Sequence, residues 1–185
     1  MASLRTVLQE THKILLVSVA PNCSAQEFFA AHDPLVASNN SIEVHQWCLL
    51  TNEPPAPALD SQFQYAYIAA HGDLAGCSFC VDEQCFSKQS VIDEICEFLA
   101  DDALVVGSCC WCGTDDSAVQ IACACADQIS EIVGPIDEIT NEVMRSRAQT
   151  FFRSLGDGLS HVQAAHVAGL QHHFVADLEL SECEP

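Results

Sequence analysis

The stretch that decides the fold is "ALVVGSCCWCG", residues 103–113, in which an uncharged apolar run leads directly into three cysteines. A short apolar run of this kind predicts a buried strand, and strands that are apolar on both faces are typical of parallel sheets covered by helices. In such sheets the functional groups gather at the carboxyl ends of the strands. Cys109, Cys110 and Cys112 can therefore fill the core, form a disulfide, bind a metal, or supply a nucleophile at a strand end.

The rest of the chain alternates predicted strands with predicted helices. We expect strands over 13–20, 41–50, 64–70, 103–108 and 130–136, and helices over 24–32, 90–100, 117–129, 140–155 and 160–174. A "GDG" stop signal separates the last two helices. This alternation predicts an α/β fold, an α/β/α sandwich with a mostly parallel central sheet, in a single domain over residues 1–185. Residues 175–185 are expected to form an acidic C-terminal tail.

Composition and charge exclude several classes of partner. The formal charge is −20 with only six Lys and Arg residues, which argues against nucleic acid and anionic membranes, because phosphate binding needs clustered cations. No apolar run approaches the ~18 to 20 residues that cross a bilayer, and "MASLRTVLQETHK" at the N-terminus lacks the apolar segment of a secretion signal. We therefore expect a soluble, cytoplasmic protein.

The twelve cysteines are interpreted in that setting. A reducing cytosol favours free thiols, a metal site or catalysis over a disulfide framework. Cys23, Cys48, Cys96 and Cys183 are assigned to core filling, since a free cysteine behaves as a small hydrophobe. Cys123 and Cys125 lie two apart on a predicted helix, so they point to different faces and make poor co-ligands.

A histidine and a thiol are predicted to meet at one edge of the sheet. "YIAAHGD", residues 67–73, places His71 and Gly72 at the end of one strand, and residues 103–108 deliver Cys109 and Cys110 to the end of another. If these strands are neighbours, His71 can take the thiol proton, and the thiolate can attack a carbonyl. The amide N–H groups of Gly72 and of the nucleophile could form an oxyanion hole worth about 3 to 4 kcal/mol per donor.

These stretches resemble the caspase-like cysteine peptidases, which include caspases, metacaspases, legumain-type enzymes and CHAT-domain proteins. Their shared pattern is an apolar strand ending in His-Gly, then a helix, then an apolar strand ending in a small residue and Cys. The stretch "FFRSLGDGLSHVQAAHVAG", residues 151–169, is also similar to the paired helices that close CHAT domains. The resemblance spans residues 13 to about 174 and implies a caspase-like α/β/α sandwich with cysteine endopeptidase activity.

Two cysteines are candidates for the nucleophile, depending on how the positions are counted. Counting from Ala103 along the apolar run selects Cys109. The family pattern often carries a glycine three residues after the catalytic cysteine, and Gly113 stands three after Cys110. Metacaspases also show a cysteine doublet whose second member reacts. The resemblance therefore favours Cys110 as the nucleophile, and Cys109 remains the alternative.

The resemblance also implies a mechanism and partners. His71 and Cys110 would form the catalytic dyad, the amides of Gly72 and Cys110 would hold the oxyanion, and the intermediate would be a thioester. This chemistry needs no cofactor. The implied partners are a protein substrate and a regulatory or effector protein.

Two rival interpretations come from other classes of protein. "CSFCVDEQC", residues 77–85, places Cys77, Cys80 and Cys85 close together, but a zinc ribbon needs a second CxxC or CxxH pair at suitable spacing. We therefore expect no metal and predict a hairpin over residues 72–87 whose thiols flank the cleft. The other rival is an inactive caspase-like binding module, since a fold does not establish a function.

Asp115 and Asp116 follow the cysteine loop and are candidate substrate-binding residues. Their simpler interpretation is the N-cap of the next helix. An excess of negative potential around the cleft should draw basic peptides and repel acidic ones. Few cations are available to hold an Asp side chain at the P1 position of a substrate, so we expect P1 to be basic or uncharged.

Overall fold

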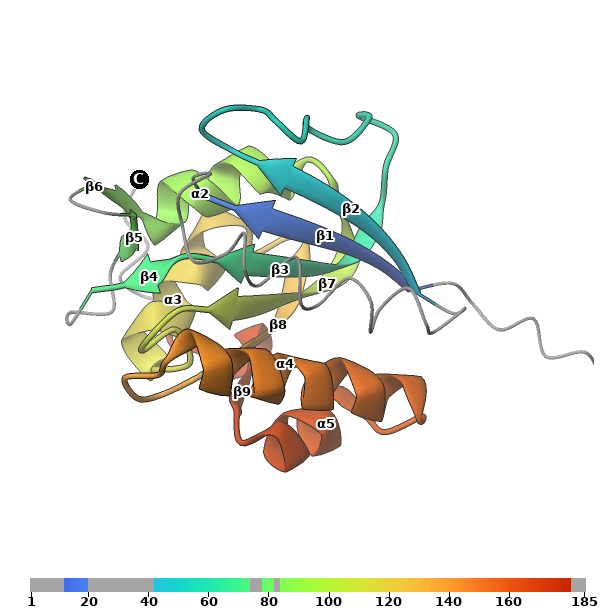
Figure 1. Ribbon diagram of the computed structural model, residues 1–185, viewed down its shortest axis with the longest axis vertical. Coiled ribbons are helices and arrows are strands. Elements are labelled where there is room, and N and C mark those ends of the chain that lie inside the picture. The colour runs from blue at the N-terminus through green and yellow to red at the C-terminus, as the bar shows by residue number, and fades with distance from the viewer. Residues whose placement is uncertain (1–11, 20–41, 74–77, 82–83, 181–185) are drawn as a thin grey trace, which may run out of the picture.

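The structure is a computed structural model that describes residues 12–19, 42–73, 78–81 and 84–180. A central sheet of six strands has the order β2-β1-β3-β7-β8-β9 (Figure 1). Neighbouring strands are parallel from β2 to β8, and β9 is antiparallel to β8. This confirms the predicted α/β fold with a mostly parallel sheet. The strands are β1 His12–Ser18, β2 Ile42–Cys48, β3 Phe63–Ala69, β7 Leu99–Ser108, β8 Ile129–Gly134 and β9 Gln171–Phe174.

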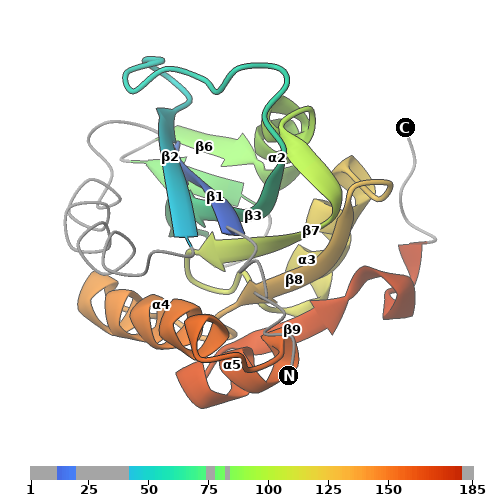
Figure 2. The same ribbon diagram turned by 90° about the vertical axis from the view of Figure 1, so that its right-hand side faces the viewer.

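The middle strands are buried on both faces because helices cover both sides of the sheet. Consecutive residues of β1 and of β7, such as Leu15 and Leu16 or Val105 and Val106, are inaccessible to solvent. Figure 2 shows α2 and α3 on one face and α4 and α5 on the other. Continuous apolar strands are the pattern expected of a parallel sheet in this position.

Each described α-helix begins at a hydroxyl residue that accepts a hydrogen bond from its first turn. The helices are α2 Lys88–Cys96, α3 Asp115–Ala124, α4 Asn141–Gly156 and α5 His161–Ala168, with N-caps Ser87, Thr114, Thr140 and Ser160. Such caps satisfy backbone N–H groups that have no partner inside the helix. None of the helices in the described ranges has the length and apolar character required to span a bilayer.

A second, antiparallel sheet lies beyond the carboxyl end of β3. It consists of β4 His71–Gly72, β5 Ser78–Val81 and β6 Gln84–Ser87. The hairpin predicted over residues 72–87 is thereby confirmed. His71 pairs with Cys80, and Gly72 pairs with Phe79. The strand end predicted to carry His71 is thus a short strand of its own, which fixes its backbone.

The last predicted helix, over residues 160–174, is wrong in its second half. Helix α5 ends at Ala168, because Gly169 adopts a left-handed conformation with φ of 69° and caps it. The chain then returns as β9 along β8. Beyond β9, Val175 is buried and Leu178 and Leu180 pack against the core, within the stretch expected to be a tail.

Two predicted helices are shorter than expected. The helix expected over 90–100 ends at Cys96, and Leu99 already belongs to β7. The helix expected over 117–129 ends at Ala124. The helix expected over 24–32 lies outside the described residues, as do Cys23, Cys77 and Cys183.

Among the described residues, the expectation of free thiols is wrong for two pairs of cysteines and for Cys123, which is also disulfide-bonded. Cys80 and Cys85 face each other across the β5–β6 hairpin and form a disulfide. Cys96, which was assigned to core filling, forms a disulfide with Cys125. The reason is tertiary: α2 ends beside the end of α3, which leaves the two α-carbons 6.1 Å apart, a separation that a disulfide can bridge. Cys48, Cys109, Cys110 and Cys112 are free thiols.

Candidate active site

Two neighbouring strands carry the candidate dyad to one edge of the sheet. β3 and β7 are parallel partners, and Ala69 at the end of β3 is opposite Ser108 at the end of β7. Figure 1 shows their arrowheads pointing to the same side, where β4 lies. The condition for bringing His71 and Cys110 together, that their strands be neighbours, is therefore met.

Gly72 packs directly against the backbone of Cys110. A β-carbon at residue 72 would overlap the carbonyl oxygen of Cys110 and lie 3.2 Å from its amide nitrogen. The obstacle is backbone, which cannot move aside as a side chain can. Only glycine fits at residue 72, and the His71–Gly72 segment is held against the cysteine loop.

The two candidate nucleophiles differ in exposure. Cys109 is 2% exposed and points into the core, whereas Cys110 is partly exposed. The Sγ atom of Cys110 accepts the N–H of Ile139 at 3.4 Å and lies 3.6 Å from the Ile139 carbonyl oxygen. A thiol in this position can be reached from solvent. His71 is exposed.

The loop after β7 has a constrained backbone. Trp111, directly after Cys110, has φ of 64°, a left-handed conformation that is uncommon for a bulky residue. Such conformations persist where the surroundings fix them, and they cluster at functional sites. The Trp111 N–H donates to the Asp137 carbonyl at 3.3 Å, and the Gly113 N–H donates to the Pro135 carbonyl at 2.8 Å. The loop after β8 therefore supports the loop that carries Cys110.

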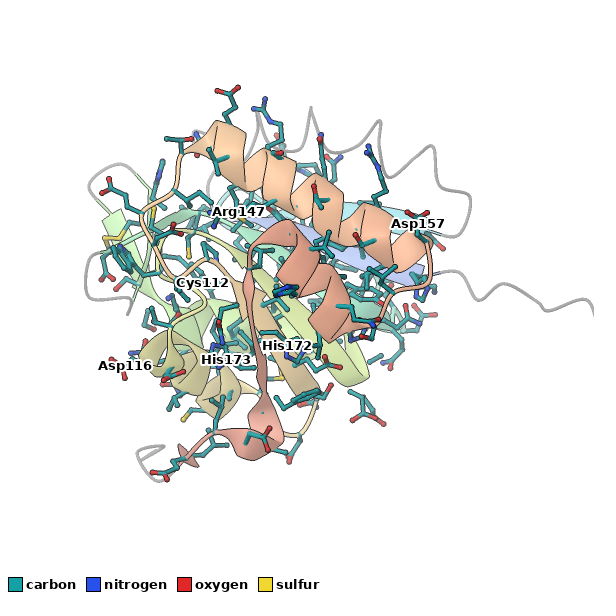
Figure 3. All side chains as sticks on the ribbon, turned by 90° about the horizontal axis from the view of Figure 1, so that it is seen from below. Cys112, Asp116, Arg147, Asp157, His172 and His173 are labelled. Atoms are coloured by element: carbon teal, nitrogen blue, oxygen red, sulfur yellow. A yellow bond between two sulfur atoms is a disulfide. The ribbon has the colours of Figure 1, made fainter. Side chains whose placement is uncertain are left out.

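Strand β9 supports the same loop from the other side. Figure 3 shows His172 and His173 on opposite sides of β9, as consecutive residues of a strand must be. The Nε2–H of His173 donates to the carbonyl oxygen of Gly113 at 2.7 Å. The predictions from sequence missed this contact, because they placed both histidines on a helix.

Asp115 and Asp116 occupy the first turn of α3, and the N-cap is the preceding residue, Thr114. The interpretation of these aspartates as the cap itself is thus off by one residue. Both are exposed, and a carboxylate oxygen of Asp115 lies 3.6 Å from Nδ1 of His173. Asp115 also lines a cavity of about 400 Å³ on the β9 side of α3, together with residues that include His173, Asp177 and Glu179. The described contacts of Asp115 thus lie toward β9.

A buried polar cluster lies beneath the cysteine loop. Lys88 at the start of α2 is fully buried, and its ammonium hydrogen-bonds the hydroxyl of Ser117 on α3. The same ammonium lies 5.6 Å from the centre of the Phe79 ring. Lys88 was not predicted as a site residue, because the helix was expected over 90–100 and Lys88 lies before that range.

Cys109 and Cys112 border this cluster, and their pKa values are shifted in opposite directions. A hydrogen bond with Cys112, together with burial, raises the pKa of Cys109 well above its usual value. The same hydrogen bond, the positive charge of Lys88 and a hydrogen bond with Ser117 lower the pKa of Cys112 to about 7. Buried Cys109 is therefore a poor nucleophile, and the pKa of Cys112 is lowered although its thiol lies in the core.

A second polar cluster joins α5 to the sheet. The Glu131 carboxylate accepts hydrogen bonds from His161, at 2.8 Å, and from His172. His161 also hydrogen-bonds the Tyr65 hydroxyl at 3.2 Å, beside a cavity of about 360 Å³. Burial raises the pKa of Tyr65, and the charge of Glu131 adds to this. Burial alone would raise the pKa of Glu131, but the hydrogen bonds from His172 and His161 bring it below the usual value.

Metal ligation finds little support in the described ranges. Within them, no group of three or more His, Cys, Asp or Glu side chains is arranged to hold a metal ion. Cys80 and Cys85, two of the three proposed zinc ligands, are bonded to each other.

Comparison with known proteins shows a fold that this chain shares, but it does not assign the chain to a family. No protein-family model matches the chain, and no curated protein matches it. A solved structure that is similar is a secreted C11 cysteine protease from Bacteroides thetaiotaomicron, in complex with an irreversible peptide inhibitor. The TM-score is 0.52 at 11% sequence identity, and the match covers 85% of this chain and 56% of the protease chain. The shared property is the caspase-like α/β/α sandwich with its mostly parallel sheet.

Proposed function

We propose that this chain is a cysteine endopeptidase that cleaves protein substrates with Cys110 as nucleophile and His71 as general acid and base. The observation that carries the proposal is the packing of Gly72 against the Cys110 backbone. It brings a His-Gly segment and a partly exposed thiol together at the carboxyl edge of a parallel sheet, where such folds place their functional groups. The likeness to the fold of a cysteine protease adds support.

The proposed reaction proceeds in two stages. His71 removes the proton from the Cys110 thiol, and the sulfur attacks the carbonyl carbon of the scissile peptide bond. The amides of Gly72 and Cys110 donate to the oxygen as it becomes negative. The C–N bond breaks, and His71 gives its proton to the leaving amine. A water molecule, deprotonated by His71, then attacks the thioester, which releases the acid product and returns the thiol.

The exposure of Cys110 and the raised pKa of buried Cys109 support Cys110 as the nucleophile. The Cys109 thiol is buried, and its pKa is raised, so it reaches neither the substrate nor the thiolate state easily. Cys110 is partly exposed and has an N–H donor at its sulfur. The metacaspase-like doublet favours the same residue.

Charge supports a basic or uncharged residue at P1 of the substrate. The chain carries 26 Asp and Glu against six Lys and Arg. Of these cations, Lys88 is buried and Arg147 pairs with Asp137 at 3.3 Å. Asp115 and Asp116 are exposed carboxylates close in sequence to the nucleophile loop. A regulatory or effector protein partner, which the CHAT-like resemblance implies, stays a prediction.

The test is covalent labelling with a peptide that carries a thiol-directed electrophile. The wild type should gain one label at Cys110, located by mass spectrometry, and should hydrolyse a protein substrate. Cys110→Ala and His71→Ala should each abolish hydrolysis, since removing either member of an acting pair costs nearly the whole effect. Cys109→Ala is the matched control and should keep both properties.

Two outcomes would contradict this assignment. If Cys109→Ala loses the label and Cys110→Ala keeps it, the register is off by one. If the folded wild type takes no label and cleaves nothing, the inactive binding module is the better interpretation. Circular dichroism of each variant shows that a lost activity is not a lost fold.

A further inference from the structure

Two buried thiols bracket the proposed nucleophile. Cys109 and Cys112 are separated by Cys110 and Trp111, in a C-x-x-C arrangement. The Cys112 N–H donates to the Cys109 carbonyl at 3.3 Å, which closes a four-residue turn. The ends of such a turn lie within about 7 Å of each other. The interaction between the two thiols shifts the pKa of each, so their sulfurs lie close together.

The surroundings of this pair fit a dithiol that changes its oxidation state. Gly107 leaves the space that the Cys112 sulfur occupies, because a β-carbon at residue 107 would overlap that atom. The interaction with Cys109, the charge of the Lys88 ammonium and a hydrogen bond with Ser117 lower the pKa of Cys112. Cys112 is therefore the partner that ionises near pH 7, and Cys109 is the partner that keeps its proton. A redox pair needs this division into an attacking and a resolving thiol.

We propose that Cys109 and Cys112 are a redox-active dithiol, which hydrogen peroxide converts into a disulfide that encloses Cys110. The Cys112 thiolate attacks one peroxide oxygen, the O–O bond breaks, and the hydroxide released takes up a proton to become water. The Cys109 sulfur then attacks the Cys112 sulfenic acid. The S–S bond forms, the S–O bond breaks, and the oxygen leaves as a second water with the Cys109 proton. Two thiols and one peroxide thus give a disulfide and two waters, and a dithiol reductant reverses the change.

The burial of Cys109 and Cys112 limits which oxidants can reach them. Cys109 and Cys112 are 2% and 0% exposed, so a small neutral molecule such as peroxide can enter by local opening where a bulky disulfide reagent cannot. Oxidation would draw the sulfurs from hydrogen-bond contact to about 2.05 Å and tighten the turn that carries Cys110. A displacement of about 1 Å at a reacting group can cost ~100-fold in rate. On the basis of the proposed function, we therefore expect oxidation to slow hydrolysis at least about tenfold.

Peroxide treatment followed by disulfide mapping tests the site. The full chain is treated with increasing peroxide, unfolded, alkylated and digested with chymotrypsin, which cuts after Trp111 and so separates Cys109 from Cys112. Wild type and Cys110→Ser should both give two peptides joined by a reducible link. Cys109→Ser and Cys112→Ser should not. Cys48, a free thiol that is 3% exposed on β2, is the internal control and should remain alkylated.

The pH dependence tests the role of Cys112 without removing a cysteine. Because thiolate is the reacting form, the rate of linkage should rise about tenfold between pH 6 and pH 8 in the wild type. Lys88→Met removes the positive charge and should move the midpoint of this rise upward from about pH 7. A rate that is flat over this range would overturn the assignment of Cys112 as the attacking thiol.

Two further results would overturn the dithiol itself. One is a link that disappears in Cys110→Ser, since the bond would then involve Cys110. The other is an unreacted pair at peroxide doses that already oxidise Cys110. If the chain hydrolyses no peptide but the Cys109–Cys112 disulfide still forms, the peptidase proposal is wrong and the dithiol proposal is supported.

Discussion

The α-carbon of Gly72 lies against the peptide of Cys110, so the two segments that carry the proposed dyad touch through their backbones. Side chains can change rotamer and separate, but a backbone contact of this kind cannot relax without moving a strand. Because Gly72 belongs to β4 and Cys110 follows β7, this contact joins the small sheet to the central one. The distance between the proposed base and nucleophile therefore depends on a glycine.

Gly72→Ala should damage both stability and activity. The added methyl group collides with the Cys110 carbonyl, and overpacking of this kind costs about 1 to 3 kcal/mol. We expect hydrolysis to fall about 100-fold, because a displacement near 1 Å has that effect on a reacting pair. Urea denaturation and a peptide cleavage assay measure the two quantities. Gly156→Ala, at an exposed position in α4, is the matched control and should not destabilise the protein. Equal effects at the two positions would refute the contact.

The Cys96–Cys125 and Cys80–Cys85 disulfides should differ in their contribution to stability. Cys96 and Cys125 are 29 residues apart, and Cys80 and Cys85 are five apart. A bridge that closes a longer loop restricts the unfolded chain more, which gives about 3 to 4 kcal/mol for the first pair and about 2 kcal/mol for the second. The double variants with alanine at each pair, unfolded in urea without reductant, test this order. A larger loss for the Cys80 and Cys85 variant would contradict it.

Glu131 should contribute stability that acid removes. Its pKa is lowered in the folded protein by hydrogen bonds from His172 and His161, so its contribution is complete above the pKa of the unfolded chain and is lost as pH falls through the folded value. Glu131→Gln should cost about 1 to 3 kcal/mol at pH 7, because one histidine N–H loses its acceptor. The gap between wild type and variant should shrink as pH falls below ~4, the usual range of a glutamate.

Urea denaturation at several pH values checks this prediction. Glu94→Gln, at an exposed position of α2, is the control and should run parallel to the wild type. A constant gap between wild type and Glu131→Gln from pH 7 to pH 3 would show that the carboxylate charge contributes nothing.

Cleavage should disfavour acidic residues at P1. A protein with a net charge of −20 repels acidic peptides, and most of its few cations are engaged, buried or on α4. A peptide library varied at P1 should therefore show cleavage after basic or uncharged residues, and raised salt should weaken the preference. The double variant Asp115→Asn with Asp116→Asn should reduce cleavage after Lys and Arg. A clear majority of cuts after Asp or Glu would contradict this prediction.

Strongly apolar runs locate most of the strands that carry the proposed site. Such runs can be recognised in the sequence, so much of the site could be predicted. β1 and β3 fall where apolar stretches predicted them, and β2 lies within the strand predicted over 41–50 although polar residues interrupt it. β7 begins at Leu99, four residues early, because Asp101 and Asp102 interrupt the apolar pattern within the strand. The predicted meeting of His-Gly and Cys rested only on parallel strands ending at one edge, and the pairing of Ala69 with Ser108 bears out that condition.

The features that escaped prediction depend on residues distant in sequence. Lys88 has the local sequence of an exposed helical residue, and its burial is decided by Phe79 and by Ser117 on another helix. "QHHF", residues 171–174, contains no β-branched residue and becomes a strand only because β8 offers it a partner. The Cys96–Cys125 bridge depends on the placement of two helices against each other.

Strand β9 has a consequence for the order in which the proposed site forms. From β1 toward β9 the sheet adds its strands in the order in which the ribosome makes them: β3, β7, β8 and finally β9. The Gly113 carbonyl in the nucleophile loop receives its hydrogen bond from His173, which belongs to that final strand. A nascent chain that has emerged only as far as β8 already carries His71 and Cys110 but lacks this support. Completion of the loop thus waits until β9 has been made and has paired with β8, which delays the proposed hydrolysis until then.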